Sequence, residues 1–294
     1  MSKALKGKGA LPRLQTSWDL RAACNFIGGG TGTGLLIMSA FFAGAGQDYF
    51  GSLLLGLGFV AFGLFMVWLE IGRPWRSMNL FFHPQTSWMT REGILAIPVF
   101  SLGALVLFYH PMAAGPWVAG LIALLALGYL YCQAQMLRNA KGIPSWANPA
   151  LTPYIMVTGL TEGMGMAICF PALGGQGALA VFALLLIGRL VFWSRYQLRL
   201  KSDGAPQASC DTIAAARPPV LLVGHLLPIL LLIIATVADS WSGLLIPFAG
   251  VLAAAMGWYS KAVIITRAAQ TRGFAIPKMP VRGKPGDRLS NQGW

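Results

Sequence analysis

Long apolar runs, separated by short polar segments, dominate this sequence of 294 residues. Several runs extend for about 20 residues without a charge, which is the length that an α-helix needs to cross the ~30 Å hydrocarbon core of a membrane. We therefore expect an all-α fold, a polytopic transmembrane bundle of eight helices. The predicted spans cover 22–44, 51–69, 93–109, 117–137, 152–173, 177–193, 218–237 and 241–265.

The composition agrees with this class. Hydrophobic residues make up 56% of the chain and charged residues only 11%, whereas about a quarter of the residues in a soluble globular domain are charged. An ordinary soluble protein is therefore excluded. The predicted organisation is a basic arm over 1–21, a transmembrane domain over 22–266 and a basic tail over 267–294.

The net charge of +13 is unevenly distributed along the predicted bundle. Every Lys and Arg lies in the arm, the tail, or the turns at 70–92, 138–151 and 194–217 with their helix ends, whereas the opposite turns carry Asp48 and Asp239. Lys- and Arg-rich loops stay in the cytoplasm, so both termini are expected there. This basic end is a candidate docking face for a soluble partner; the alternative is that the basic loops only orient the bundle.

Two short polar segments between the second and third spans concentrate charge. They contain Glu70, Arg73, Arg76, Arg91 and Glu92. These side chains either form an interfacial ion-pair network that fixes the turn or contribute to a binding site.

One acidic residue, Glu162, lies near the middle of the fifth predicted span. A charge at that depth costs at least ~2–3 kcal/mol, so it is a functional candidate by default. The alternative is a hydrogen-bonded glutamate that ties helices together. Arg189 is either its partner or extends to the interface, and His225 is either a buried core residue or part of a proton or quinone site.

The metal-ligating residues are dispersed. The four cysteines form no CxxC pair, and iron–sulfur clusters or structural zinc need grouped thiolates. The three histidines form no pair at similar depth that would hold a haem. We expect neither a haem nor an iron–sulfur cluster in this chain.

A glycine run, GGGTGTG at 28–34, lies inside the first span. It lacks the spacing and the preceding strand of a nucleotide-binding loop. Gly28 with Gly32, and Gly30 with Gly34, instead form two small-residue faces that predict close helix packing. Asn25, one turn earlier, either bonds a ligand carbonyl or bridges helix ends.

Several short motifs, taken together, resemble the DmsC/NrfD/PsrC-type membrane anchors of molybdopterin oxidoreductases. They are G-x-P-x-R at 72–76, S-W-x-x-R-E at 87–92, I-P-S-W at 143–146, G-W-x-x-K at 257–261, I-T-R at 265–267 and G-F at 273–274. The resemblance covers essentially the whole chain. It implies a subunit of the bacterial cytoplasmic (inner) membrane that belongs to a heterotrimeric complex of anaerobic respiration.

The resemblance also implies the chemistry. Such an anchor binds a quinone (menaquinone or ubiquinone) and exchanges electrons with a partner subunit that carries four [4Fe-4S] clusters and is joined to a molybdopterin catalytic subunit. The Arg and Glu linked to quinol binding in the family correspond to Arg76 and Glu92, while a histidine position is occupied by Glu70. With a cytoplasmic docking face, substrate oxidation with quinone reduction is favoured.

The remaining candidates fall into three groups. Asn25, Tyr131, Gln133 and Tyr154 complete the expected quinone site. Glu162, His225 and Arg189 form a possible proton pathway, and Arg73, Arg91, Trp88 and Trp146 form the expected docking surface. Two rival hypotheses are a secondary transporter with Glu162 as its coupling-ion site and a purely structural anchor.

Overall fold

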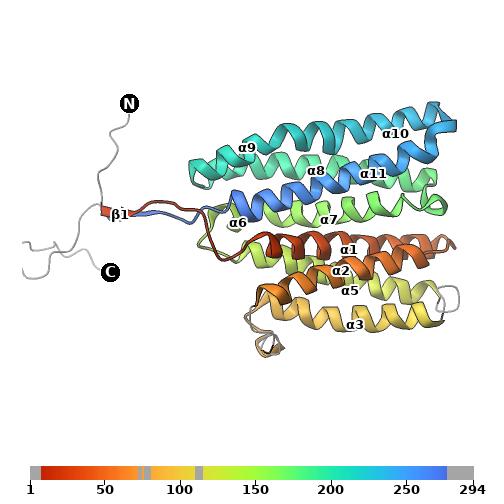
Figure 1. The fold of residues 1–294 in the computed structure, drawn as a ribbon, viewed down its shortest axis with the longest axis horizontal. Coiled ribbons are helices and arrows are strands. Elements are labelled where there is room, and N and C mark those ends of the chain that lie inside the picture. Colours follow the sequence, from red (N-terminus) through yellow and green to blue (C-terminus); the bar gives the residue numbers. More distant parts are fainter. Residues whose placement is uncertain (1–7, 72–74, 76–80, 110–114, 277–294) are drawn as a thin grey trace, which may run out of the picture.

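Helices running along one common axis form the body of the molecule (Figure 1). The structure is a computed structural model, and it describes residues 8–71, 75, 81–109 and 115–276. The first group of helices comprises α1 (Leu20–Gly44), α2 (Phe50–Glu70), α3 (Trp88–Tyr109) and α5 (Pro116–Arg138). The second group comprises α7 (Leu151–Ala167), α8 (Gln176–Ser202), α9 (Gln207–Leu221), α10 (Leu227–Val237) and α11 (Asp239–Ala262).

Shorter elements complete these groups. They are the strands β1 (Lys8–Ala10) and β2 (Phe274–Ile276), the helix α6 (Pro144–Ala147), the 3-10 turn η2 (Pro171–Leu173) and the π-helical turns η3 (Leu222–Leu226) and η4 (Val263–Arg267). Because η3 joins α9 to α10 without a break, these three elements form one rod.

The two groups meet along α1 and α7. Helix α1 contacts α2 and α5 in its own group and α7 and α11 in the other. Its most apolar stretch is 78% buried, compared with 28% for α8. Helix α1 is therefore the central packing element, and α8 belongs to the periphery.

Seven helical segments are long and apolar enough to cross a membrane, judged over the described residues. The membrane class is thereby supported. The predicted span 152–173 corresponds to α7, which has 17 residues and ends at Ala167, before Pro171 opens a separate 3-10 turn. It falls short of the other spans in length, and the count of eight stays a prediction.

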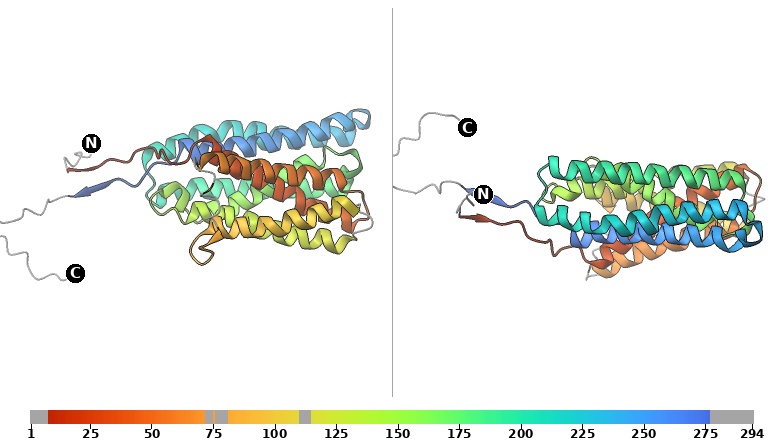
Figure 2. Two further views of the ribbon diagram at one scale, coloured as in Figure 1. Left: turned by 60° about the horizontal axis from the view of Figure 1, so that its bottom comes forward. Right: turned by 90° about the horizontal axis from the view of Figure 1, so that it is seen from above.

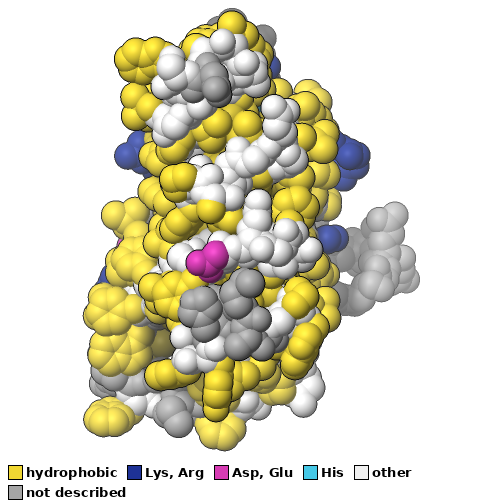
Figure 3. Space-filling model, turned by 90° about the vertical axis from the view of Figure 1, so that its right-hand side faces the viewer, with side chains coloured by type: hydrophobic (Ala, Val, Ile, Leu, Met, Phe, Trp, Pro, Cys, Tyr) yellow, Lys and Arg dark blue, Asp and Glu magenta, His cyan; other side chains and the backbone are white. Residues whose placement is uncertain are grey.

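The outer surface of the bundle is apolar. Large hydrophobic side chains are exposed on several helices, including Phe108, Trp117, Leu184 and Val237. The end of the bundle away from the termini shows mostly hydrophobic and uncharged side chains, with Lys and Arg only at its margins (Figure 3). The apolar side chains exposed along the helices match a lipid environment.

The two terminal segments lie together at one end of the bundle (Figure 2). Strands β1 and β2 pair antiparallel, with Lys8 opposite Ile276. Further along, the backbone N–H of Gln15 donates to the carbonyl of Ala269 at 2.9 Å. The described part of the basic arm is therefore packed against the C-terminal segment.

The glycine run in α1 packs as its spacing predicts. A Cβ on Gly28 or Gly32 would collide with the backbone of α2, and one on Gly34 would collide with the carbonyl of Gly159 in α7. Gly30 faces the side chain of Lys261. The two small-residue faces are confirmed, and each one lets a different partner approach α1.

Candidate functional site

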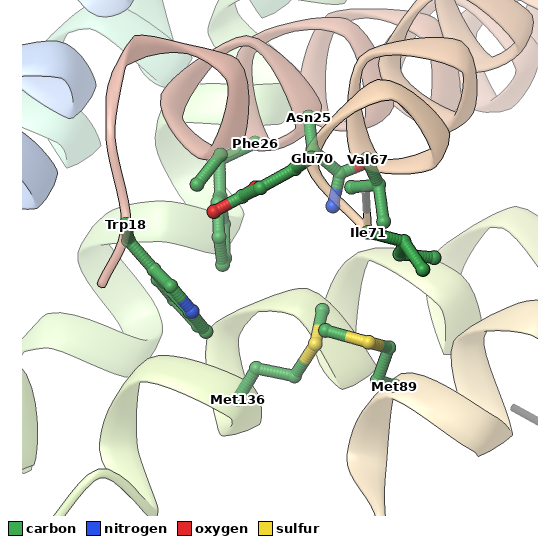
Figure 4. A pocket seen from close by; sticks show the side chains of 9 residues that line it. Trp18, Asn25, Phe26, Val67, Glu70, Ile71, Met89 and Met136 are labelled. Atoms are coloured by element: carbon green, nitrogen blue, oxygen red, sulfur yellow. The ribbon is translucent and has the colours of Figure 1, made fainter. Parts of the chain in front are cut away.

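A pocket opens between α1, α2, α3 and α5 at the end of the bundle that carries the terminal segments (Figure 4). Its volume is about 110 Å³. It is lined by Trp18, Ala22, Asn25, Phe26, Val67, Glu70, Ile71, Met89 and Met136. Seven of these nine side chains are apolar or aromatic, so the polar chemistry of the pocket comes from Asn25 and Glu70.

Trp18 forms one wall of this pocket, and it comes from the arm. Its ring lies 4.9 Å from the ring of Trp146 and 5.8 Å from that of Phe26. The Gln15 amide donates to the Trp18 carbonyl at 2.6 Å and to the carbonyl of Ile265 at 3.2 Å, which holds the arm in place. Trp18 is not among the site residues predicted from the sequence, where its only signal is an aromatic side chain at the junction between a polar arm and an apolar helix.

Glu70 is the last residue of α2 and is half-buried. Its carboxylate extends toward Trp18 and Phe26 (Figure 4). The nearby Arg21 attracts Glu70 through space, but its guanidinium is bound to Asp19 at 2.8 Å. Hydrogen bonds from the Arg21 side chain and backbone hold the pKa of Asp19 below its usual range, so that pair stays ionised near neutral pH.

Asn25 is 2% exposed, and its Oδ1 has no hydrogen-bond partner among the described residues. Its backbone carbonyl accepts from Nε2 of Gln133 at 3.0 Å. The same nitrogen donates to Oε1 of Glu92 at 2.9 Å, and the side chain of Tyr129 also approaches that carboxylate. Three predicted quinone-site residues, Asn25, Gln133 and Glu92, are therefore brought together.

Glu92 lies behind the pocket and does not line it. It is 2% exposed, and no basic side chain in the described ranges forms an ion pair with it. Arg76, its predicted companion, lies outside the described residues, as does Arg73.

The two predicted tyrosines do not line the pocket. Tyr131 is 41% exposed and meets the ring of Trp88 edge-on at 5.7 Å. Because Tyr131 precedes the inward-facing Gln133 by two residues, the helical period of 3.6 turns it to the opposite side of α5. Tyr154 is buried and donates to Oγ of Ser260 at 2.6 Å, so it belongs to the packing between α7 and α11.

Arg91 and Trp88, both predicted docking residues, stabilise the turn before α3. The Arg91 guanidinium lies 4.0 Å from the centre of the Trp88 ring. It also donates to the carbonyls of Pro84 at 2.7 Å and Gln85 at 2.8 Å. This geometry supports the interpretation that these residues fix the turn.

Trp146, predicted as a docking residue, is 3% exposed and lies inside the protein. Its indole N–H donates to the carbonyl of Ile264 at 2.9 Å, while Trp18 covers its ring. The I-P-S-W segment forms the short helix α6. A side chain enclosed in this way offers no surface to a partner.

Glu162 is paired with Lys261, not with Arg189. Nζ of Lys261 lies 2.7 Å from Oε2 of Glu162, and both side chains are 0% exposed. Thr31 donates to the same oxygen at 2.8 Å. Lys261 also donates to the carbonyl of Phe26 at 3.0 Å, and Phe26 lines the pocket. The buried pair thus contacts the segment of α1 that forms the pocket wall.

The charge distribution predicts that Lys261, at the end of the last span, belongs to the basic face together with the tail, but its side chain lies in the core. The sequence feature that could have indicated this burial is the position of Lys261 in the G-W-x-x-K motif, within an apolar run. Gly30 and Gly257 leave the space: a Cβ on Gly30 would touch Nζ of Lys261, and one on Gly257 would touch Oε1 of Glu162. That Oε1 has no hydrogen-bond partner within the described part of the chain.

Arg189 and His225 form a second buried polar group. The Arg189 side chain donates to Nε2 of His225 at 3.2 Å, to the carbonyl of Ala253 at 2.7 Å and to that of Gly224 at 2.5 Å. Nδ1 of His225 lies 2.8 Å from the carbonyl of Val220. A carbonyl only accepts, so Nδ1 carries the hydrogen and Nε2 is the acceptor.

Both His225 nitrogens are thus occupied, and the residue lies in the π-helical turn η3. Arg189 binds carbonyls of that turn and of α11. This geometry favours a helix-tying role for both residues over a role in carrying protons.

Neither a search for metal-ligand clusters nor the comparisons with known proteins assign a function to these residues. No group of three His, Cys, Asp or Glu side chains that would hold a metal ion occurs among the residues that the structure describes. A scan against protein-family models finds no match to this chain, and a search of curated proteins finds no relative.

Proposed function

We propose that this chain is the quinone-binding membrane anchor of an oxidoreductase complex. Its partners are an iron–sulfur subunit with [4Fe-4S] clusters and a molybdopterin catalytic subunit, and it passes electrons to the quinone pool. The single observation that carries the proposal is the apolar pocket at the basic end of the bundle, whose polar groups are Glu70 and Asn25.

The lining of the pocket fits a quinone head group. A flat, weakly polar ring suits walls of aromatic and thioether side chains, here Trp18, Met89 and Met136. Pockets of this kind use a few polar groups to orient the ligand. The buried Asn25 amide is such a group, and its oxygen has no partner in the described chain.

A bound quinone would supply two-electron, two-proton redox chemistry. In this chain, Glu70 holds or transfers a proton at its carboxylate, which replaces the histidine of the similar anchors. Asn25 orients the ligand, and Trp18 limits the access of water from the loop end. Glu92 and Gln133 support Asn25 from behind.

The position of the pocket supports docking of the partner at the same end. The terminal segments and the turn held by Arg91 lie there. We propose eight spans with both termini in the cytoplasm of a bacterium, because Lys- and Arg-rich loops stay on that side. A cytoplasmic catalytic subunit would then oxidise its substrate and reduce quinone.

The test uses the assembled complex in membranes. Glu70→Gln and Asn25→Leu are expected to abolish or strongly reduce quinone-dependent turnover, while electron transfer to a soluble dye continues. Asp211→Asn is the matched control, because Asp211 is an exposed carboxylate of α9 that does not line the pocket. Normal quinone turnover in both pocket variants would contradict the proposal.

A second candidate, a secondary transporter, rests on Glu162. Its Oε1, beside Gly257 of α11, has no hydrogen-bond partner among the described residues, and Oε2 binds Lys261. Uptake by the purified chain that is lost in Glu162→Gln would favour this candidate. Quinone that copurifies with the complex, and is missing when this subunit is absent, would favour the anchor that binds quinone over a purely structural one.

A further inference from the structure

A second groove lies between α8 and α9, apart from the quinone pocket. Its volume is about 320 Å³. It is lined by Ser194, Gln197, Leu198, Leu200 and Lys201 of α8 and by Cys210, Ile213, Ala214 and Arg217 of α9. On each helix the residues recur mainly at intervals of three and four, so the groove lies between two facing helix surfaces.

Two basic side chains, Lys201 and Arg217, line this groove at different positions along the helix axes. Lys201 lies in the last turn of α8, beside the connection to α9. Arg217 follows Cys210 by seven residues, which places it about 10 Å further along the helix axis. Neither cationic group forms an ion pair or a side-chain hydrogen bond with any described residue.

The nearest acidic side chains of these helices are already bound. Asp203 accepts from the Asn148 amide at 3.1 Å, and Asp211 accepts from the Gln207 amide at 2.7 Å. Neither of the two lines the groove. The groove therefore presents positive charge that its own surroundings leave available for an anion.

The mouth of the groove continues into the lipid-facing surface. Leu198 on its rim is 76% exposed. Further along α8, away from the loop, Val191 lies seven residues before Leu198, on the same side of the helix, and is 48% exposed. A ligand held at Lys201 and Arg217 would thus have an apolar surface beside it, directed toward the interior of the membrane.

We propose that this groove binds an anionic phospholipid, with its phosphate at Arg217 and Lys201 and its acyl chains over Leu198 and Val191. Arg and Lys are the usual phosphate-binding side chains, and basic pockets between transmembrane helices suit anionic head groups. A free phosphate ion would meet the same two cations but leave the adjoining apolar surface uncovered. The lipid would bridge α8 and α9 and stabilise their packing on the outside of the bundle.

The test uses the purified full chain, delipidated in detergent and then given phosphatidylglycerol or phosphatidylcholine. Native mass spectrometry measures the lipid retained, and thermal unfolding measures stabilisation. The wild type is expected to retain phosphatidylglycerol preferentially. In Lys201→Gln/Arg217→Gln, affinity for it should fall about thirtyfold, since each basic residue contributes roughly fivefold to anionic-lipid attraction.

Two further variants separate the possible outcomes. Arg138→Gln/Arg272→Gln removes the same charge from exposed residues at the same end and should leave retention unchanged. Ala214→Trp fills the groove without a charge change and should displace the lipid. Equal loss in both charge variants, or no loss in the groove variants, would overturn the proposal. So would stabilisation by inorganic phosphate equal to that by phosphatidylglycerol.

Discussion

Lys261 and Glu162 form a salt bridge of 2.7 Å in which both side chains are completely buried. The two residues come from α11 and α7, and the lysine also binds the Phe26 carbonyl of α1. A buried ion pair of this kind is weak evidence for stability as such, because desolvation offsets much of the attraction. Through its contacts with α7, α11 and α1 the pair instead fixes how the two groups of helices pack against each other, close to the pocket that Asn25 and Glu70 line.

Removal of one charged side chain of this pair should lower the stability of the protein more than removal of both. Glu162→Gln or Lys261→Met leaves a buried charge without its counter-ion, at a cost of about 3–5 kcal/mol. The double variant removes that charge and should recover most of the loss. Thermal unfolding in detergent, analysed as a double-mutant cycle, measures the coupling.

The exposed Lys141 gives the control for this cycle, since Lys141→Met should change stability little. Strict additivity of the two buried substitutions would show that Glu162 and Lys261 are not energetically coupled.

A methyl group added at Gly34 should disrupt the contact between α1 and α7. The new Cβ would meet the backbone of Gly159, which cannot move aside as a flexible side chain would. Overpacking of a core costs about 1–3 kcal/mol, and we expect Gly34→Ala to lose that amount. Gly58→Ala in α2 is the matched control, because nothing lies near its added Cβ. It should be neutral or slightly stabilising, and equal losses in both would contradict the packing explanation.

Loss of the Trp18 ring should open the pocket that Trp18 lines to water. The ring packs against both Trp146 and Phe26. If the proposed function is right, Trp18→Ala should weaken quinone binding about tenfold, because the aromatic wall contributes roughly 1.4 kcal/mol. Titration of the purified complex with a short-chain quinone measures this, with the exposed Trp241→Ala as control. An unchanged affinity of Trp18→Ala for the quinone would show that the arm does not contribute to the binding site.

If the proposed function is right, a histidine should be tolerated at position 70. Glu70 lies at the end of α2, where its side chain reaches into the pocket. Imidazole and carboxylate both exchange protons, so Glu70→His should retain measurable quinone-dependent turnover, whereas Glu70→Leu should lose it. Steady-state assays with quinone and with a soluble dye distinguish these effects. Full turnover in Glu70→Leu would show that the proton comes from another group.

The helical membrane class followed from the sequence, because the length of an apolar run is set directly by the thickness of hydrocarbon. The two glycine faces also followed, since the helical period alone decides that Gly28 and Gly32 share one side and Gly30 and Gly34 another. The grouping of Asn25, Gln133 and Glu92 was likewise expected, because all three lie at similar depth at one end of their helices.

The other contacts were decided by the tertiary structure, because they depend on which helices pack together and on which face each helix presents to its neighbour. Glu162 and Lys261 are 99 residues apart in the chain, and no local pattern tells that α11 presents its lysine to α7. The burial of Trp146 and the outward orientation of Tyr131 depend on neighbours that the linear sequence does not name. Trp18 reaches the pocket only because the arm is held along the C-terminal segment, where backbone hydrogen bonds join residues that are distant in sequence.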